Sequence, residues 1–108
     1  MKLMIASDLH GSAYYTEALL RRLSEEKPEK LMLLGDILYH GPRNALPRDY
    51  DTKKCAAMLN ALEKAPLCIR GNCDGEVDQM VLSFPVLADF AAVFADGYTL
   101  YLTHGHHL

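Results

Sequence analysis

Six polar side chains stand after apolar runs of the sequence, at positions where strands are expected to end. They are aspartates, histidines and one asparagine: Asp8, His10, Asp36, Asn72, His104 and His106. Carboxylate, amide and imidazole groups bind divalent ions such as Mn, Fe, Zn and Ni. One carboxylate can bridge two ions, and a pair ~3.5–4 Å apart clamps the attacking and leaving oxygens of a phosphoryl transfer. These residue types therefore predict a metal site suited to phosphate chemistry.

Each of these residues, taken alone, also has a simpler interpretation. Asp8 is equally typical of a helix cap, and His10 fits a surface loop. Gly35-Asp36 is common as an ordinary turn between a strand and a helix, and Gly71-Asn72 suits a left-handed turn. The histidines at 104, 106 and 107 fit a solvated tract that binds metal only crudely. The joint placement of all of them on successive strand ends favours a metal site.

The hydrophobic spacing predicts the elements that would position these side chains. Unbroken apolar runs at 3–6, 31–34 and 67–69 are typical of strands buried on both faces. Two helices between them are predicted from apolar residues at helical spacing: Tyr15, Leu19 and Leu23 in one, and Cys55, Met58, Leu59 and Leu62 in the other. Ser12 and Asp51 would cap these helices, and Pro28 and Pro66 would end them.

The order of elements predicts an α/β fold. Strand–helix–strand–helix–strand units form a parallel sheet with right-handed crossovers. A helical turn is expected at 76–82, and Phe90, Ala92 and Phe94 then alternate with other residues before the turn signal Asp96-Gly97. With a returning strand at 98–103, this segment is predicted to be a hairpin at one edge of the sheet. The carboxyl ends of parallel strands share one side of a sheet, so the polar side chains should meet there.

Composition narrows the classes of function. At 108 residues the chain has the size of one domain. Its formal charge of −3, without a long basic run, argues against nonspecific nucleic-acid binding. The apolar start at 3–6 is too short for a membrane span or a signal segment, so we expect a cytoplasmic protein with no membrane partner. Three cysteines, Cys55, Cys68 and Cys73, form no CxxC pair and fit a reducing compartment.

Four blocks, in this order, resemble those of the calcineurin-like metallophosphoesterases: Asp8-Leu9-His10-Gly11, Gly35-Asp36, Gly71-Asn72-Cys73-Asp74 and Thr103-His104-Gly105-His106. The segments 40–47 and 71–80 are similar to the YfcE-type bacterial phosphodiesterase branch in particular. The resemblance implies the N-terminal half of a four-layer αββα fold. It also implies metal-dependent hydrolysis of a small phosphodiester by a metal-bound water. The implied cofactors are two divalent ions, with Mn expected first and Zn, Fe and Ni as alternatives.

The same resemblance implies a role for each matching residue. Asp8 and His10 would bind the first ion, Asp36 would bridge both ions, and Asn72 and His104 would bind the second. Further roles concern substrate and catalysis. Asn72 would also contact phosphate, and His106 would act in catalysis as a ligand or a phosphate contact.

Two further residues have weaker assignments. Arg43 is a candidate phosphate contact because its guanidinium can bind in a bidentate manner, with a solvent-facing loop arginine as the alternative. Cys73 stands where many members of the family have a histidine that protonates the leaving oxygen. It is therefore a candidate catalytic proton donor, although a thiol is a poorer donor, and a small packing residue is the alternative.

The final Gly-His-x-His block of the family has no counterpart in these 108 residues. We therefore expect residues 1–108 to be a metallophosphoesterase domain truncated before that block. The expected function is a metal-dependent phosphodiesterase or the N-terminal portion of one; the alternative is a noncatalytic metal- or phosphate-binding fragment with an incomplete dinuclear site. An uncovered inner sheet face predicts a homo-oligomer through that face; the alternatives are that the chain borrows ligands from a neighbour or is only part of a longer protein. A phosphoacceptor receiver domain explains neither His10, Asn72 nor His104.

Overall fold

The computed structural model describes residues 1–106, and these form two small sheets and three helices. Along the chain the elements are β1 (Leu3–Ala6), α1 (Ala13–Glu26), β2 (Lys30–Leu33), α2 (Thr52–Asn60), β3 (Leu67–Cys68), α3 (Glu76–Val81), β4 (Ala91–Ala95) and β5 (Tyr98–Leu102). The predicted strand–helix–strand–helix–strand order is confirmed, and so is the α/β class.

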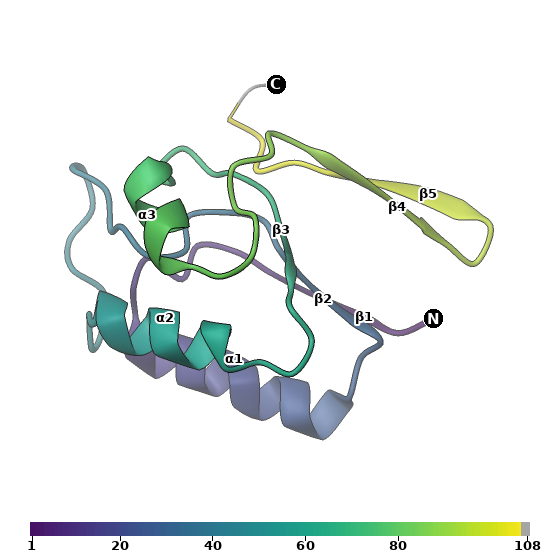
Figure 1. Ribbon diagram of the computed structural model, residues 1–108, viewed down its shortest axis with the longest axis horizontal. Helices are drawn as coiled ribbons and strands as arrows, with labels where there is room; N and C mark the ends of the chain where they lie inside the picture. Colours follow the sequence, from purple (N-terminus) through teal and green to yellow (C-terminus); the bar gives the residue numbers. More distant parts are fainter. Residues whose placement is uncertain (107–108) are drawn as a thin grey trace.

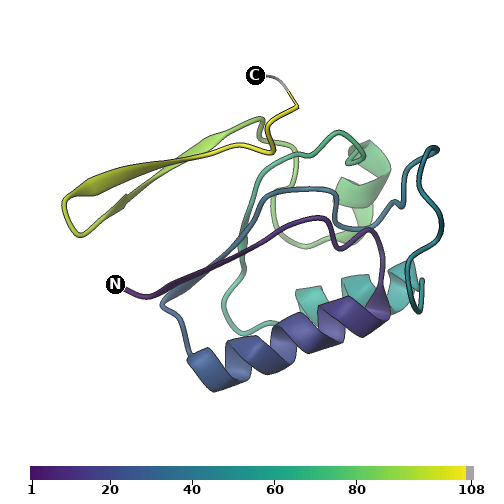
Figure 2. The same cartoon turned by 180° about the vertical axis from the view of Figure 1, so that it is seen from behind.

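The first three strands form a parallel sheet in the order β1-β2-β3. Both crossovers step in the same direction across the sheet, so right-handed connections place both helices on one face. Figure 1 shows this arrangement, with α1 and α2 together below the sheet and the β4–β5 hairpin on the opposite side. The rear view in Figure 2 shows the same three layers, with the hairpin extending beyond the sheet. The strands therefore end on one side of the molecule, where the loops after them gather.

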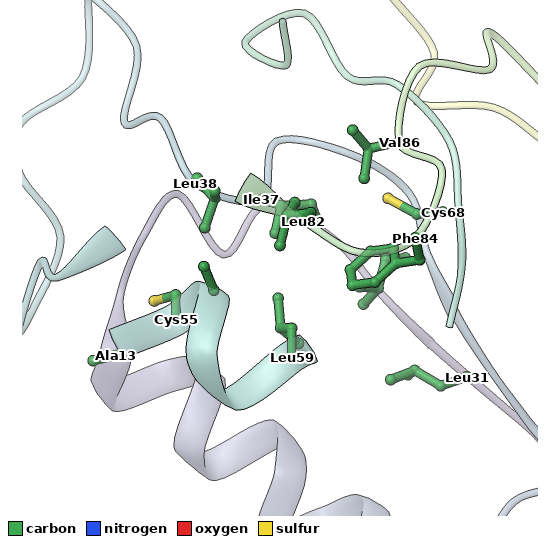
Figure 3. Packing of buried hydrophobic residues seen from close by; sticks show 12 residues of the cluster. Ala13, Leu31, Ile37, Leu38, Cys55, Leu59, Cys68, Leu82, Phe84 and Val86 are labelled. Atoms are coloured by element: carbon green, nitrogen blue, oxygen red, sulfur yellow. The ribbon is translucent and has the colours of Figure 1, made fainter. Parts of the chain in front are cut away.

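The main core lies between the helices and the sheet. Figure 3 shows its residues converging from α1, α2, the sheet and the segment after α3. Cys55 and Leu59 of α2 are almost fully buried, as the helical spacing predicts. The segment after α3 adds the fully or nearly fully buried side chains Phe84 and Val86, which the sequence did not assign to the core. Their burial fixes the path of the chain between the third strand and the hairpin.

The hairpin forms a two-stranded sheet of its own and does not extend an edge of the parallel sheet. Leu102 packs with Met32 and Ile69 in a second apolar cluster, so the hairpin covers part of the inner face of the parallel sheet. The expectation that this face is bare is therefore wrong for these residues. Side chains alternate across the hairpin, and Phe94 lies on its solvent side, where it is 78% exposed.

Both predicted helix caps are confirmed. The Ser12 hydroxyl accepts from the Tyr15 amide, and the Asp51 carboxylate accepts from the Lys54 amide. The predicted buried face of the first helix is wrong at Tyr15, which is 54% exposed. Thr16 is buried in its place, because the helix is rotated so that Thr16 packs on Cys55 of α2.

Within residues 1–106, no helix combines the length and the apolar character that crossing a membrane requires.

Candidate metal centre

The loops that follow the three parallel strands are bonded to one another. The Asp8 amide donates to the Gly35 carbonyl at 3.0 Å, and the His10 amide donates to the Asp36 carbonyl at 2.9 Å. Gly35 and Gly71 are in close contact, since a Cβ on Gly35 would lie 2.3 Å from the Gly71 nitrogen. The strand ends therefore hold the polar side chains of three separate loops together.

Three of these polar residues have a left-handed backbone. Asp8, His10 and Asp36 have φ angles of 59°, 48° and 56°. Residues other than glycine seldom adopt this region, and such strained residues cluster at functional sites, although ordinary turns of this chain also hold Asp96 and Lys27 there. The interloop hydrogen bonds constrain the backbone of Asp8, His10 and Asp36 in this region.

The predicted ligand atoms converge around Asp36. Its Oδ2 lies 3.2 Å from His104 Nε2 and 3.6 Å from His10 Nε2. The Oδ1 of Asp8 lies 3.2 Å from His10 Nε2 and 4.0 Å from His104 Nε2. Ligand atoms of Asp8, Asp36 and His104 all lie within 4.8 Å of one another, as do those of His10, Asp36 and Cys73. Asp36 belongs to both groups, as a bridging ligand would.

Backbone carbonyls fix the orientation of both histidines. His10 Nδ1 bonds to the Tyr39 carbonyl at 2.9 Å, and His104 Nδ1 bonds to the Leu34 carbonyl at 2.6 Å. Because a carbonyl only accepts, each Nδ1 carries the proton, and in a neutral ring each Nε2 has a free lone pair. Metal-binding histidines typically have this outer hydrogen bond.

The contacts at Nε2 fit a divalent ion. A neutral Nε2 and a carboxylate oxygen are both acceptors, so at 3.2 Å they need a proton or a cation between them. The Leu34 bond also ties His104, in the segment after β5, to the end of the parallel sheet.

Asp74 is a buried carboxylate that the sequence reasoning did not assign. Its oxygens accept from the backbone amides of Asp36 at 2.7 Å, Ile37 at 3.0 Å and Gly71 at 2.6 Å. Asp36 in turn accepts from the Cys73 amide at 2.7 Å through Oδ1, which leaves Oδ2 facing the histidines. Asp74 therefore joins the loops after β2 and β3 and positions Asp36. The sequence signal that could have identified Asp74 was its place in the Gly71-Asn72-Cys73-Asp74 block.

The two central carboxylates have opposite pKa shifts. Burial raises the pKa of Asp36, although the Cys73 amide and His104 act against this shift. Burial also acts to raise the pKa of Asp8, but the Ser7 hydroxyl and the two histidines outweigh it, so that pKa is lowered. The Ser7 hydroxyl donates to Asp8 Oδ2 at 2.6 Å. A cation at the centre would stabilise the charge that burial disfavours on Asp36.

A cavity of 760 Å³ opens over this centre. Asp8, His10 and Asp36 line it together with residues of the loop after β2 and of the loop after β3, namely Tyr39, Gly41, Pro42, Arg43, Asn44, Asn72 and Cys73. Arg43 is exposed and lines the same cavity as the candidate ligands. The structure thus places Asn72 and Arg43 in the cavity that the candidate ligands line.

Cys73 and His106 both lie beside the candidate metal centre: Cys73 lines the cavity, and His106 contacts His104. Burial, followed by the carboxylates of Asp36, Asp74 and Asp8, raises the pKa of the Cys73 thiol. His106 contacts His104 edge to face, with ring centroids 5.3 Å apart.

A statistical model of the family described as "Calcineurin-like phosphoesterase" matches residues 1–107. The chain belongs to the calcineurin-like phosphoesterase family. The resemblance seen in the four sequence blocks is thereby confirmed.

Relatives within the calcineurin-like phosphoesterases are similar over nearly all of this chain. Phosphodiesterase YfcE of Escherichia coli K12 is 49% identical over 106 residues, which cover 98% of this chain and 58% of that protein. YfcE of two further E. coli strains gives the same values. A solved structure of Yfce, described as a phosphoesterase from E. coli, matches with a TM-score of 0.96 and 48% identity, covering 99% of this chain and 59% of that one. The chain therefore spans somewhat over half the length of the relatives it matches.

Proposed function

We propose that this chain carries the metal centre of a phosphodiesterase that hydrolyses small phosphate diesters with two divalent ions. Mn is the first candidate ion, with Zn, Fe and Ni as alternatives for this mixed oxygen and nitrogen ligand set. The position of Asp36 carries the proposal: its Oδ2 lies within 3.6 Å of a histidine nitrogen on either side. The family and the YfcE relatives support the phosphoester chemistry.

The residues present fit such ions. Asp8 and His10 would hold one ion, Asn72 and His104 the other, and Asp36 both. Bound there, the ions would supply positive charge that activates water and stabilises the phosphoryl oxygens during transfer. The chain itself would orient the ligands through the Tyr39 and Leu34 carbonyls.

Other residues of the cavity would act on the substrate. The Arg43 guanidinium and the Asn72 amide would bind phosphoryl oxygens. The Cys73 thiol would donate a proton to the leaving oxygen, and His106 would contact the phosphate beside His104.

The activity of the whole protein is part of the proposal, because the chain spans 58% of its YfcE relatives. The Gly-His-x-His block expected from the family has no counterpart in these 108 residues, so a domain truncated before it also stays a proposal. Reading the downstream codons tests that point directly.

Turnover of bis(p-nitrophenyl) phosphate with added Mn²⁺ tests the function. Replacing a residue that merely orients a metal ligand lowers activity roughly 10- to 100-fold. Asp36 is itself a proposed ligand, so Asp36→Asn should lower turnover about 100-fold or more. Asp89→Asn, at an exposed position outside the centre, is the matched control and should leave turnover unchanged. Two bound ions without turnover in the unsubstituted chain would instead support the noncatalytic fragment. Unchanged turnover in Asp36→Asn would contradict the proposed centre.

A further inference from the structure

A second cavity, of 430 Å³, adjoins the metal centre. Tyr39 lines both this cavity and the larger one over the candidate ligands. The second cavity lies between the loop after β2, the start of α2 and α3, and its apolar lining includes Tyr50, Ala56, Val77 and Val81. Lys53 adds one ammonium group to this lining, and Asp78 adds one carboxyl group. Its volume lies in the range of small-molecule sites.

Apolar side chains around this cavity are left in water. Val77 is 74% exposed, Val81 is 51% exposed and Tyr39 is 44% exposed. Single exposed apolar residues are ordinary, but several around one concave surface mark a binding site. Filling the cavity with an apolar group would remove these side chains from water and stabilise the complex.

The wall between the two cavities is held in place. The Tyr39 carbonyl accepts the proton of His10 Nδ1 at 2.9 Å, which ties this residue to the metal centre. Its ring contacts the ring of His40 with centroids 5.1 Å apart, and His40 contacts Tyr50 at 5.3 Å. This row of three rings gives the second cavity a fixed position relative to the candidate ligands.

We propose that the second cavity binds an apolar ester group of the substrate whose phosphate lies at the metal centre. The shared residue Tyr39 carries this inference, because a group attached to the phosphate would pass over it into the apolar space. The inference rests on the proposed function and narrows the substrate class to phosphate esters with an apolar group, for which phenyl phosphate serves as the probe. A further protein segment and a second copy of the chain are the other occupants that the test distinguishes.

The test compares the affinities of methyl phosphate and phenyl phosphate for the Mn²⁺-loaded chain by calorimetry. Both carry the same phosphate group, so their difference reports the ester group alone. Phenyl phosphate should bind roughly tenfold more tightly, as expected for the extra apolar area that it buries. The double substitution Val77→Ser and Val81→Ser should reduce this preference to about threefold or less. It should leave the affinity for inorganic phosphate unchanged, since both substitutions are neutral.

Met80→Ser provides the matched control. Met80 lies on the same helix and is 82% exposed, but it does not line the cavity, so the preference for phenyl phosphate should persist. Equal affinity for the two esters in the unsubstituted chain would overturn the inference. An unchanged preference for phenyl phosphate in the double variant would also overturn the inference. If the mass of that variant in light scattering falls as well, the cavity would be assigned to a second copy of the chain. Failure of inorganic phosphate and both esters to bind would overturn the proposed function itself, and this inference with it.

Discussion

Asp36 is held from two sides. Asp74 accepts from its amide, and the Cys73 amide donates to its Oδ1, so only Oδ2 faces the histidines. Such a carboxylate loses little freedom when it binds an ion, because its rotamer is already set. The proposed ligand Asp36 and the residue that positions it, Asp74, can therefore be tested separately by substitution.

Asp74→Asn should weaken Mn²⁺ binding roughly 10- to 100-fold, as outer hydrogen-bond partners of ligands typically do. The new amide nitrogen would face backbone amides where a carboxylate oxygen now accepts, which should also lower the free energy of unfolding by about 1–3 kcal/mol. Electron paramagnetic resonance of free Mn²⁺ measures the first effect, at a temperature where the variant is folded. Thermal unfolding in a chelator measures the second effect.

Asp78→Asn is the control for Asp74, since the Asp78 carboxylate accepts from the Gly75 amide outside the metal centre. It should leave the Mn²⁺ affinity unchanged. An Asp74→Asn protein that binds Mn²⁺ as tightly as the parent would show that Asp74 serves folding alone.

Arg43→Ala should weaken the binding of inorganic phosphate to the Mn²⁺-loaded chain about tenfold, a typical cost of losing a charge-assisted hydrogen bond. Arg43→Lys should restore part of the affinity, because it keeps the charge but not the bidentate geometry. Calorimetric titration with phosphate distinguishes the three proteins. The same affinity in all of them would leave Arg43 as a solvent-facing loop residue.

At the scale of elements, the centre depends on how closely the loops after β2 and β3 approach. Gly71 leaves room for Asp36, and no residue with a side chain would do so at this position. A Cβ on residue 71 would lie 2.2 Å from Asp36 Oδ1 and 2.6 Å from the Asp36 backbone nitrogen. The short strands by themselves would not bring the loops after β2 and β3 into contact. The glycine pair at positions 35 and 71 lets the two loops meet.

Gly71→Ala should therefore lower the free energy of unfolding by about 2–4 kcal/mol, because the loops must separate to admit a methyl group. It should also weaken Mn²⁺ binding by displacing Asp36. Gly75→Ala is the control, with nothing within 4 Å of its added Cβ and a backbone φ of −143°. Chemical denaturation should show a change within about 1 kcal/mol for this control. Equal stability of the two variants would disprove the tight approach.

At the scale of the molecule, the hairpin is packed on one side only. Ala91, Val93 and Leu100 face the parallel sheet, whereas Phe94 and Tyr101 on the other side are 78% and 76% exposed. Ile5 on β1 is 54% exposed. Soluble monomers seldom leave large apolar and aromatic side chains, such as Phe94 and Tyr101 on one hairpin face, uncovered.

We accordingly propose a homo-oligomer through the outer hairpin face; the homo-oligomer through the inner sheet face, expected from the sequence, stays a prediction. Light scattering should give a mass above the 12.1 kDa of one chain. The double substitution Phe94→Ser and Tyr101→Ser should shift the mass to that of a monomer. Met80→Ser, an equally exposed residue on α3, should not. A monodisperse monomer in the unsubstituted protein would refute the proposal.

The sequence by itself determined the types of element and the residues at their ends. Apolar runs, helix caps at Ser12 and Asp51 and the four polar blocks are local features, so they can be interpreted without knowing what packs on what. The family resemblance added the ligand set, which stays a prediction; the structure brings the side chains of Asp8, His10, Asp36 and His104 close together.

Only the tertiary structure decided the long-range contacts. Periodicity could not show that Tyr15 faces solvent, because a small rotation of the helix exchanges neighbouring positions. Nor could it show that His104 reaches the Leu34 carbonyl, which requires the hairpin to lie across the sheet. Asp74 acquires its role because folding buries it against two loops. Local preferences fix which atoms can bind, whereas packing between distant segments fixes the distances at which they do so.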